Sequence, residues 1–92
     1  MRSENSLVEV IAHFSKEHKE PMPLRVRITE SDELVVLKIE YVKSIKYLTS
    51  ECIQYECCFL RDEQQTMFFL TYWLRDMQWH IAKGNGKEQR FL

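Results

Sequence analysis

Residues 24–41 read LRVRITESDELVVLKIEY, and in this segment apolar and polar side chains alternate on both sides of an acidic turn. Alternation with a period of two is typical of a β-strand that buries one face. A hairpin that turns at residues 30–33 places each inward apolar side chain opposite another: the pairs are Ile28–Val35, Val26–Leu37 and Leu24–Ile39. This match favours a β-hairpin, because register is set by the apolar pattern of the two strands.

The same alternation continues through three further segments. Their inward residues are Ile53, Tyr55, Cys57 and Phe59, then Phe68, Leu70, Tyr72 and Leu74, and finally Met77, Trp79 and Ile81. A four-residue loop at 62–65 and a two-residue loop at 75–76 connect these strands in antiparallel order. The resulting pairs include Phe59–Phe68, Ile53–Leu74, Leu74–Met77, Tyr72–Trp79 and Leu70–Ile81. The sequence therefore predicts a five-stranded antiparallel meander over residues 23–82.

Residues 34–48 fit two patterns. Leu34, Leu37 and Tyr41 recur at the spacing of a helix, but the segment is rich in β-branched residues and contains no alanine. β-Branched side chains favour strands over helices. We expect one long strand, bent near residues 42–43.

The N-terminal segment carries the signals of a helix. Leu7, Ile11 and Phe14 recur at i, i+4 and i+7, and Ser6 followed by Glu9 has the spacing of a capping box. Prolines then interrupt the pattern from position 21 onward. These features predict a helix over residues 6–19.

This helix is too short to cover the sheet. Its apolar stripe is roughly 15 Å long, whereas one face of five strands measures roughly 20 Å by 20 Å. We therefore expect the sheet to curl into a small barrel, with the helix plugging one end or lying across one wall. A flat sheet that buries its face against a second copy, as a homodimer, is the alternative. In a barrel of this size side chains should fill the interior, so we infer no small-molecule ligand.

The prediction is thus a single α+β domain over residues 1–92, in which an N-terminal helix precedes a five-stranded antiparallel meander curled into a small barrel. The glycine-rich, charged tail at residues 84–92 is expected to be mobile.

Composition limits the environment and the partners. The 92 residues include 13 Lys plus Arg and 14 Asp plus Glu, and this net charge of -1 argues against a dedicated DNA-binding protein. The longest uncharged run, residues 64–74, is well short of the ~20 residues of a membrane-spanning helix, and residues 1–4 do not resemble a secretory signal. Three cysteines cannot all pair with one another, which favours a reducing compartment, and we expect a cytoplasmic protein with no membrane association.

Candidate catalytic and metal-binding groups are few. In the predicted register Glu56 and His80 face each other across Thr71, roughly 10 Å apart, and Cys58 lies still farther from His80. Alternation turns Cys57 inward and Cys58 outward, so the two thiols diverge and cannot share a metal. The sequence contains no phosphate-binding loop and no Cys-x-x-Cys pair. We therefore expect no enzyme, no cofactor and no metal.

Large apolar side chains also fall on the face that should be exposed. We call Leu60, Met67, Phe69 and Trp73 the outer-face patch. Either the N-terminal helix covers this patch, or the patch binds a protein partner or a second copy of the chain.

Three basic residues are predicted beside the outer-face patch: Arg25, Arg27 and Lys38. Together with the aromatic side chains they could hold single-stranded nucleic acid by stacking and phosphate contacts. The leading hypothesis is a non-catalytic protein-interaction module that binds through the patch or through the exposed edge strand at residues 24–29. A weak single-stranded nucleic-acid binder is the alternative, and an enzyme that uses Glu56 and His80 is the remote one.

Three short motifs carry a resemblance to known proteins. PLRVR at residues 23–27, YEC at 55–57 and WHI at 79–81 together resemble a group of small uncharacterised bacterial single-domain β-rich proteins. The resemblance spans residues 21–83 and implies a cytoplasmic protein with no assigned activity, so no functional residues carry over. The strand order is also similar to that of SH3-like and PH-like small barrels, an analogy of architecture alone.

Overall fold

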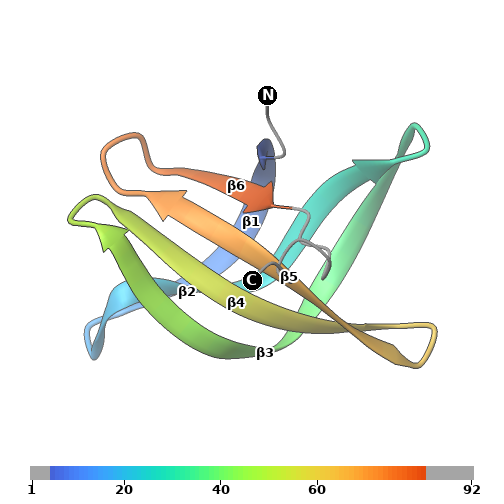
Figure 1. Cartoon of the computed structure of the whole chain (residues 1–92), viewed down its shortest axis with the longest axis horizontal. Helices are drawn as coiled ribbons and strands as arrows, with labels where there is room; N and C mark the ends of the chain where they lie inside the picture. Colours follow the sequence, from blue (N-terminus) through green and yellow to red (C-terminus); the bar gives the residue numbers. More distant parts are fainter. Residues whose placement is uncertain (1–4, 83–92) are drawn as a thin grey trace, which may run out of the picture.

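The chain forms a closed antiparallel β-barrel of six strands in the computed structural model, which describes residues 5–82 (Figure 1). Neighbours around the barrel follow the chain order, and the first and last strands pair to close it. The strands are β1 (Asn5–Ser15), β2 (His18–Glu30), β3 (Glu33–Thr49), β4 (Cys52–Arg61), β5 (Gln64–Trp73) and β6 (Gln78–Ala82). Because these residues contain no helix, none of them forms a helix that could cross a membrane. The predicted mobile tail lies outside the described residues.

The predicted N-terminal helix is wrong, and with it the α+β fold class: the segment is strand β1. Its first residues pair with β6, with Val8 opposite Trp79, and its later residues pair with β2, with Val10 opposite Val26. A sheet of five strands would leave unpaired backbone N–H and C=O groups along its two edge strands, β2 and β6. β1 forms hydrogen bonds with part of each of these edges. The fold is therefore an all-β barrel of six strands.

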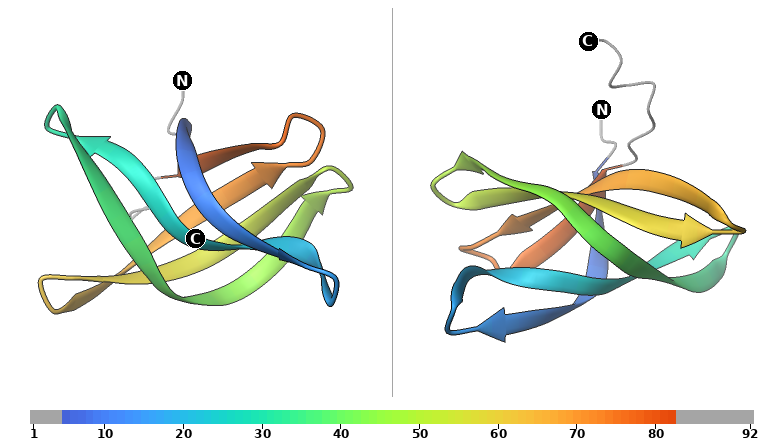
Figure 2. Two further views of the ribbon diagram at one scale, coloured as in Figure 1. Left: turned by 180° about the vertical axis from the view of Figure 1, so that it is seen from behind. Right: turned by 90° about the horizontal axis from the view of Figure 1, so that it is seen from below.

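The barrel consists of two sheets that share strands β1 and β3. The large sheet contains the start of β1, β6, β5, β4 and the second half of β3, and the small sheet contains the rest of β1, β2 and the first half of β3. The two views of Figure 2 show β1 passing from beside β6 to beside β2. β1 changes partner between Val8 and Glu9, and β3 changes partner between Lys38 and Ile39.

The long bent strand predicted over residues 34–48 is confirmed as part of β3. Three irregularities interrupt its pairing with β4, and one of them lies between Val42 and Ser44, at the predicted bend. Four residues of β3 pair with inward residues of β4: Ile39, Val42, Ile45 and Tyr47. Val35 and Leu37, which pair with β2, extend the same inward face toward the start of β3. A bulge adds one residue to a strand, so some of these intervals are three residues instead of two. The segment also fitted a helix because β3 carries large apolar residues on its outward face as well, among them Leu34 and Tyr41.

Several predicted pairs are present, while the β4–β5 register is wrong by two residues. Ile28–Val35, Val26–Leu37, Tyr72–Trp79 and Leu70–Ile81 are all formed. β4 and β5 are joined by a tight turn at Asp62 and Glu63, which both have positive φ, and Cys57 therefore lies opposite Phe68. Two-residue turns with positive φ at both positions match the twist of a hairpin better than the predicted four-residue loop.

Two further predicted pairs are not formed. Leu24 lies at a bulge of β2 against β1, and the pairing of β2 with β3 ends at Arg25–Lys38, so Leu24 does not reach Ile39. Leu74 and Met77 belong to the turn between β5 and β6. The backbone N–H of Met77 donates to the carbonyl of Trp73 at 2.7 Å and closes this turn.

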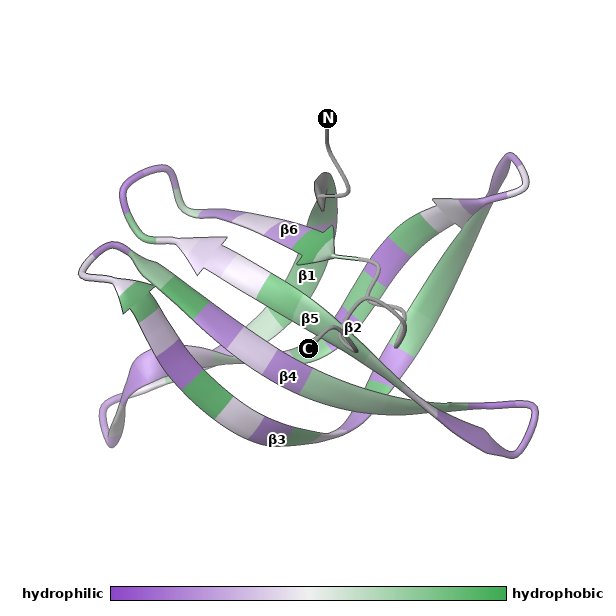
Figure 3. Cartoon of the chain, viewed as in Figure 1, coloured by the Kyte–Doolittle hydropathy of each residue, from purple (hydrophilic) through white to green (hydrophobic). Residues whose placement is uncertain are grey.

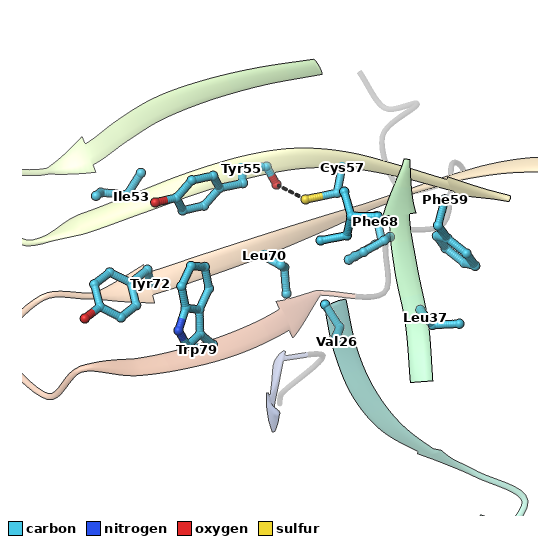
Figure 4. Packing of buried hydrophobic residues seen from close by; sticks show 11 residues of the cluster. Val26, Leu37, Ile53, Tyr55, Cys57, Phe59, Phe68, Leu70, Tyr72 and Trp79 are labelled. Atoms are coloured by element: carbon cyan, nitrogen blue, oxygen red, sulfur yellow. Dashed lines mark hydrogen bonds between the residues drawn. The ribbon is translucent and has the colours of Figure 1, made fainter. Parts of the chain in front are cut away.

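The core consists of the inward side chains of all the strands except β1, whose inward residues are partly buried against it. Green and purple alternate along the strands in Figure 3, as expected for walls with one apolar face. Trp79 packs against Tyr72 and Tyr55, with ring centroids 4.5 Å and 5.4 Å apart (Figure 4). The Tyr55 hydroxyl donates to the buried carbonyl of Pro21 at 2.6 Å, and this bond ties β4 to β2 across the interior.

Candidate functional site

The outer-face patch lies along β4 and β5, but its residues are unequally exposed. Leu60 is half exposed and Trp73 is 40% exposed, whereas Met67 and Phe69 are partly buried. No helix covers the patch, because the N-terminal segment is a strand of the barrel. The alternative in which a helix docks there is therefore wrong.

The structure does not bring the basic residues to the patch. Arg25 pairs with Lys38 as predicted, but β2 lies three strands from β5 in both directions around the ring. The arginines of β2 are therefore on the wall opposite Trp73. Arg27 forms an ion pair with Glu9 of β1. The predicted free edge at residues 24–29 is likewise paired with β1 as far as Arg27.

The candidate acid–base pair is not assembled either. Thr71 pairs with His80, but Glu56 pairs with Phe69, two positions away along β5. The Glu56 carboxylate accepts a hydrogen bond from the Ser44 hydroxyl at 3.1 Å. The geometry thus gives the two side chains no common substrate position.

All three cysteines are free, and all three are buried. Burial raises the pKa of Cys57 to about 12 and also raises the pKa of Cys52. A side-chain hydrogen bond with Cys58 raises the pKa of Tyr41, which lies opposite this cysteine on β3. A raised pKa keeps the thiols of Cys52 and Cys57 protonated and unreactive. Residues 5–82 contain no cluster of three metal-ligating side chains.

A cleft of about 800 Å³ lies between β1 and β2. β1 turns toward β6 before Glu9 while β2 continues along β3 after Arg27, so the two strands separate. The floor of the cleft consists of partly or fully buried inward residues: Val8, Val10, Ile28, Trp79 and Ile81. Its rim includes three large apolar side chains, Leu7, Leu34 and Met77, which are 61%, 65% and 72% exposed. We call this set of residues the β1–β2 cleft.

A second, smaller opening of about 260 Å³ lies at one end of the barrel. Its apolar lining includes Ile28 and Ile81, which also line the β1–β2 cleft. At its rim Arg61 donates to the Glu30 carboxylate at 3.1 Å, and this hydrogen bond raises the pKa of Arg61. The apolar lining is therefore accessible from this end, and the expectation that the barrel takes no small-molecule ligand stays a prediction.

The sequence analysis does not identify the rim residues of the β1–β2 cleft as a binding surface, for two reasons. Leu7 was assigned to the buried stripe of a helix, and Met77 was placed in a strand. Leu34 carried a usable signal, since it falls on the outward face of the predicted hairpin although it is apolar. The cleft itself depends on where β1 leaves β2, which no local pattern predicts.

Comparison of the chain with protein-family models, with curated proteins and with solved structures finds no match.

Proposed function

We propose that this protein is a non-catalytic protein-interaction module that binds an extended apolar segment of a partner in the β1–β2 cleft. The observation that supports this most strongly is the exposed apolar rim, Leu7, Leu34 and Met77, above an apolar floor. Large apolar side chains that gather at the edge of a cavity mark an interaction site more than scattered ones do. The three free thiols support a cytoplasmic location for this activity.

The backbone along the cleft favours a polypeptide as the occupant. Within the described residues no pairing joins β1 to β2 beyond Glu9–Arg27. Val8 of β1 is therefore paired on the β6 side only, and Ile28 of β2 on the β3 side only. Free strand edges of this kind accept an added strand through main-chain hydrogen bonds, while alternate side chains enter pockets. A partner strand would place every second side chain over the floor of the cleft.

The test uses a display library of extended peptides selected on the immobilised protein. Peptides that bind should lose about tenfold or more in affinity with Leu34→Glu and with Met77→Glu, because each change puts a charge against the apolar segment. Leu60→Glu is the matched control, since Leu60 is also an exposed leucine but lies outside the cleft. In a Trp73→Phe background, Trp79 at the floor should report binding through its fluorescence.

The opposite pattern would overturn the proposal. If Leu60→Glu abolishes binding while Leu34→Glu and Met77→Glu do not, the outer-face patch is the interaction surface. If no peptide binds in the cleft although the variants remain folded, the cleft is not a site for partner segments.

A further inference from the structure

The outer face of the small sheet adjoins the rim of the β1–β2 cleft and carries two basic residues that lie opposite each other, Arg25 and Lys38. We call these two residues the basic pair. We propose that the partner segment bound in the cleft has acidic residues next to its apolar part, and that the basic pair binds their carboxylates. This inference rests on the proposed function of the cleft. It adds the charge of the partner and the side on which the partner leaves the cleft.

Three rows of paired residues form the outer face of the small sheet. They are Thr29–Leu34, then Glu9–Arg27–Val36, then Ile11–Arg25–Lys38, and all of these residues are exposed. The β1–β2 cleft is lined by Thr29, Leu34, Glu9 and Arg27. The cleft therefore opens onto the first two rows, and the basic pair lies in the row that follows.

A partner segment that continues past the Glu9–Arg27 end of the cleft has to pass over this outer face. β1 and β2 pair from Glu9–Arg27 onward, so no strand position remains between them. The interior is closed at this point, because the next pair is Val10–Val26 and Val26 is completely buried. On the outer face, Arg25 follows Arg27 at a distance of about 7 Å along β2. The partner therefore reaches the basic pair within about two of its own residues.

The charges of the basic pair are not neutralised by the barrel. Like charges directly opposite each other destabilise a sheet. Among residues 5–82, neither Arg25 nor Lys38 forms an ion pair or a side-chain hydrogen bond. Glu9, the one carboxylate in the three rows, is paired with Arg27. A carboxylate from a partner would supply the missing charge, since a guanidinium binds both of its oxygens.

The net charge of this face differs in sign from that of the whole chain. The three rows contain three basic residues and one acidic residue, a formal charge of +2, whereas the total for the chain is -1. Complementary charge at an apolar site favours an acidic partner over a neutral one and speeds its encounter with the site.

An acidic protein segment fits this face better than single-stranded nucleic acid. Nucleic acid is held by aromatic side chains on which the bases stack, and the three rows contain none. They contain instead Ile11, Leu34 and Val36, which are all more than half exposed. Aliphatic and basic side chains together match an extended peptide that carries both apolar and acidic residues.

Peptides selected from the display library measure the charge preference. Each selected peptide is compared with a copy in which Asn and Gln replace Asp and Glu. We expect this replacement to weaken binding about fivefold in the unchanged protein, as for the loss of two partly exposed ion pairs. In Arg25→Gln with Lys38→Gln the same replacement should change the affinity by less than about twofold.

Lys43→Gln with Lys46→Gln is the matched control. Both lysines are exposed on the half of β3 that pairs with β4, so the variant has the same change of charge away from the small sheet. The fivefold preference for the acidic peptides should remain in it. Its loss there would overturn the inference, because the preference would then come from net charge and not from the basic pair.

A charge reversal provides a second test. Arg25→Glu with Lys38→Glu should bind most tightly to copies of the peptides with Lys in place of Asp and Glu. Urea unfolding checks the fold: removal of a like-charge contact in Arg25→Gln with Lys38→Gln should not lower the midpoint. A lower midpoint would show that the pair stabilises the sheet, which would contradict the inference.

The remaining outcomes separate this inference from the proposed function. If the peptides bind in the cleft but contain no acidic residues, or if their charge preference persists in Arg25→Gln with Lys38→Gln, only this inference fails. If a short oligothymidylate binds more tightly than every peptide and the same variant abolishes its binding, the basic pair is a nucleic-acid contact instead. If no peptide binds in the cleft, the proposed function and this inference fail together.

Discussion

Removal of the Tyr55 hydroxyl tests the contact that ties β4 to β2 through the barrel interior. Tyr55 is fully buried, and its hydroxyl donates to the carbonyl of Pro21, which is itself buried. Burial also raises the pKa of Tyr55, so the hydroxyl stays protonated and remains a donor at all ordinary pH values. Tyr55→Phe keeps the ring and its contact with Trp79 but leaves the Pro21 carbonyl without its donor.

The expected cost follows from that orphaned carbonyl. A buried polar group that loses its partner typically costs 1–3 kcal/mol, and we expect about 1.5 kcal/mol for Tyr55→Phe. With a urea m-value of about 1 kcal/mol/M for a domain of this size, the unfolding midpoint should fall by about 1.5 M. Circular dichroism during urea titration measures this shift.

Tyr47→Phe is the matched control. The Tyr47 hydroxyl donates to the Glu20 carboxylate at 3.2 Å and joins β3 to β2, but here Tyr47 is exposed and Glu20 is partly exposed. Water replaces this donor, so we expect a loss below about 0.5 kcal/mol. Equal stabilities of the two variants would show that the buried Tyr55–Pro21 bond does not stabilise the link between β4 and β2.

Two other predictions concern a turn and a titration. Glu63 has a φ of 66° in the two-residue β4–β5 turn, so Glu63→Gly should stabilise the protein by about 0.5–1 kcal/mol, measured as a higher thermal midpoint. The pKa of Cys57 rises from 9.0 to about 12 on folding, so the unfolded chain releases this proton first and stability falls as pH rises above 9. The loss attributable to Cys57 should reach about 1.4 kcal/mol at pH 10 and should be absent in Cys57→Ala; an unchanged pH dependence in that variant would contradict the assignment.

Much of the barrel wall could be predicted from residues 24–81, because apart from the bulges of β2 and β3 its side chains alternate with a period of two. The inward faces of β4, β5 and β6 were identified correctly even where the register was wrong. A shift of two residues leaves every side chain on its own face, so the alternation alone could not detect the β4–β5 error. The β4–β5 register is set by the two-residue turn at Asp62 and Glu63, where both residues have positive φ.

The N-terminal segment could not be predicted in the same way. Both faces of β1 carry apolar residues: Val8 and Val10 pack against the core, whereas Leu7 and Ile11 are exposed. This distribution satisfies a helical spacing and a strand spacing at once. What selects the strand is the pairing with two distant edges, at β2 and β6, and this long-range effect overrides the local capping pattern.

The candidate site depended on that same segment. A closed ring places β2 opposite β5, which separates the predicted basic residues from the aromatic patch. The cleft arises where β1 exchanges one neighbour for another, so it could not be located before β1 was known to be a strand.

The pairing of β1 with both neighbours is therefore the observation on which the cleft and its proposed functions depend. Cross-strand nuclear Overhauser effects in the full chain measure it directly. The structure predicts contacts between Val8 and Trp79 and between Val10 and Val26, with no contact between β1 and β2 beyond Glu9–Arg27. Sequential contacts between residues three apart over 6–19, as in a helix, would contradict the six-stranded barrel and remove the cleft.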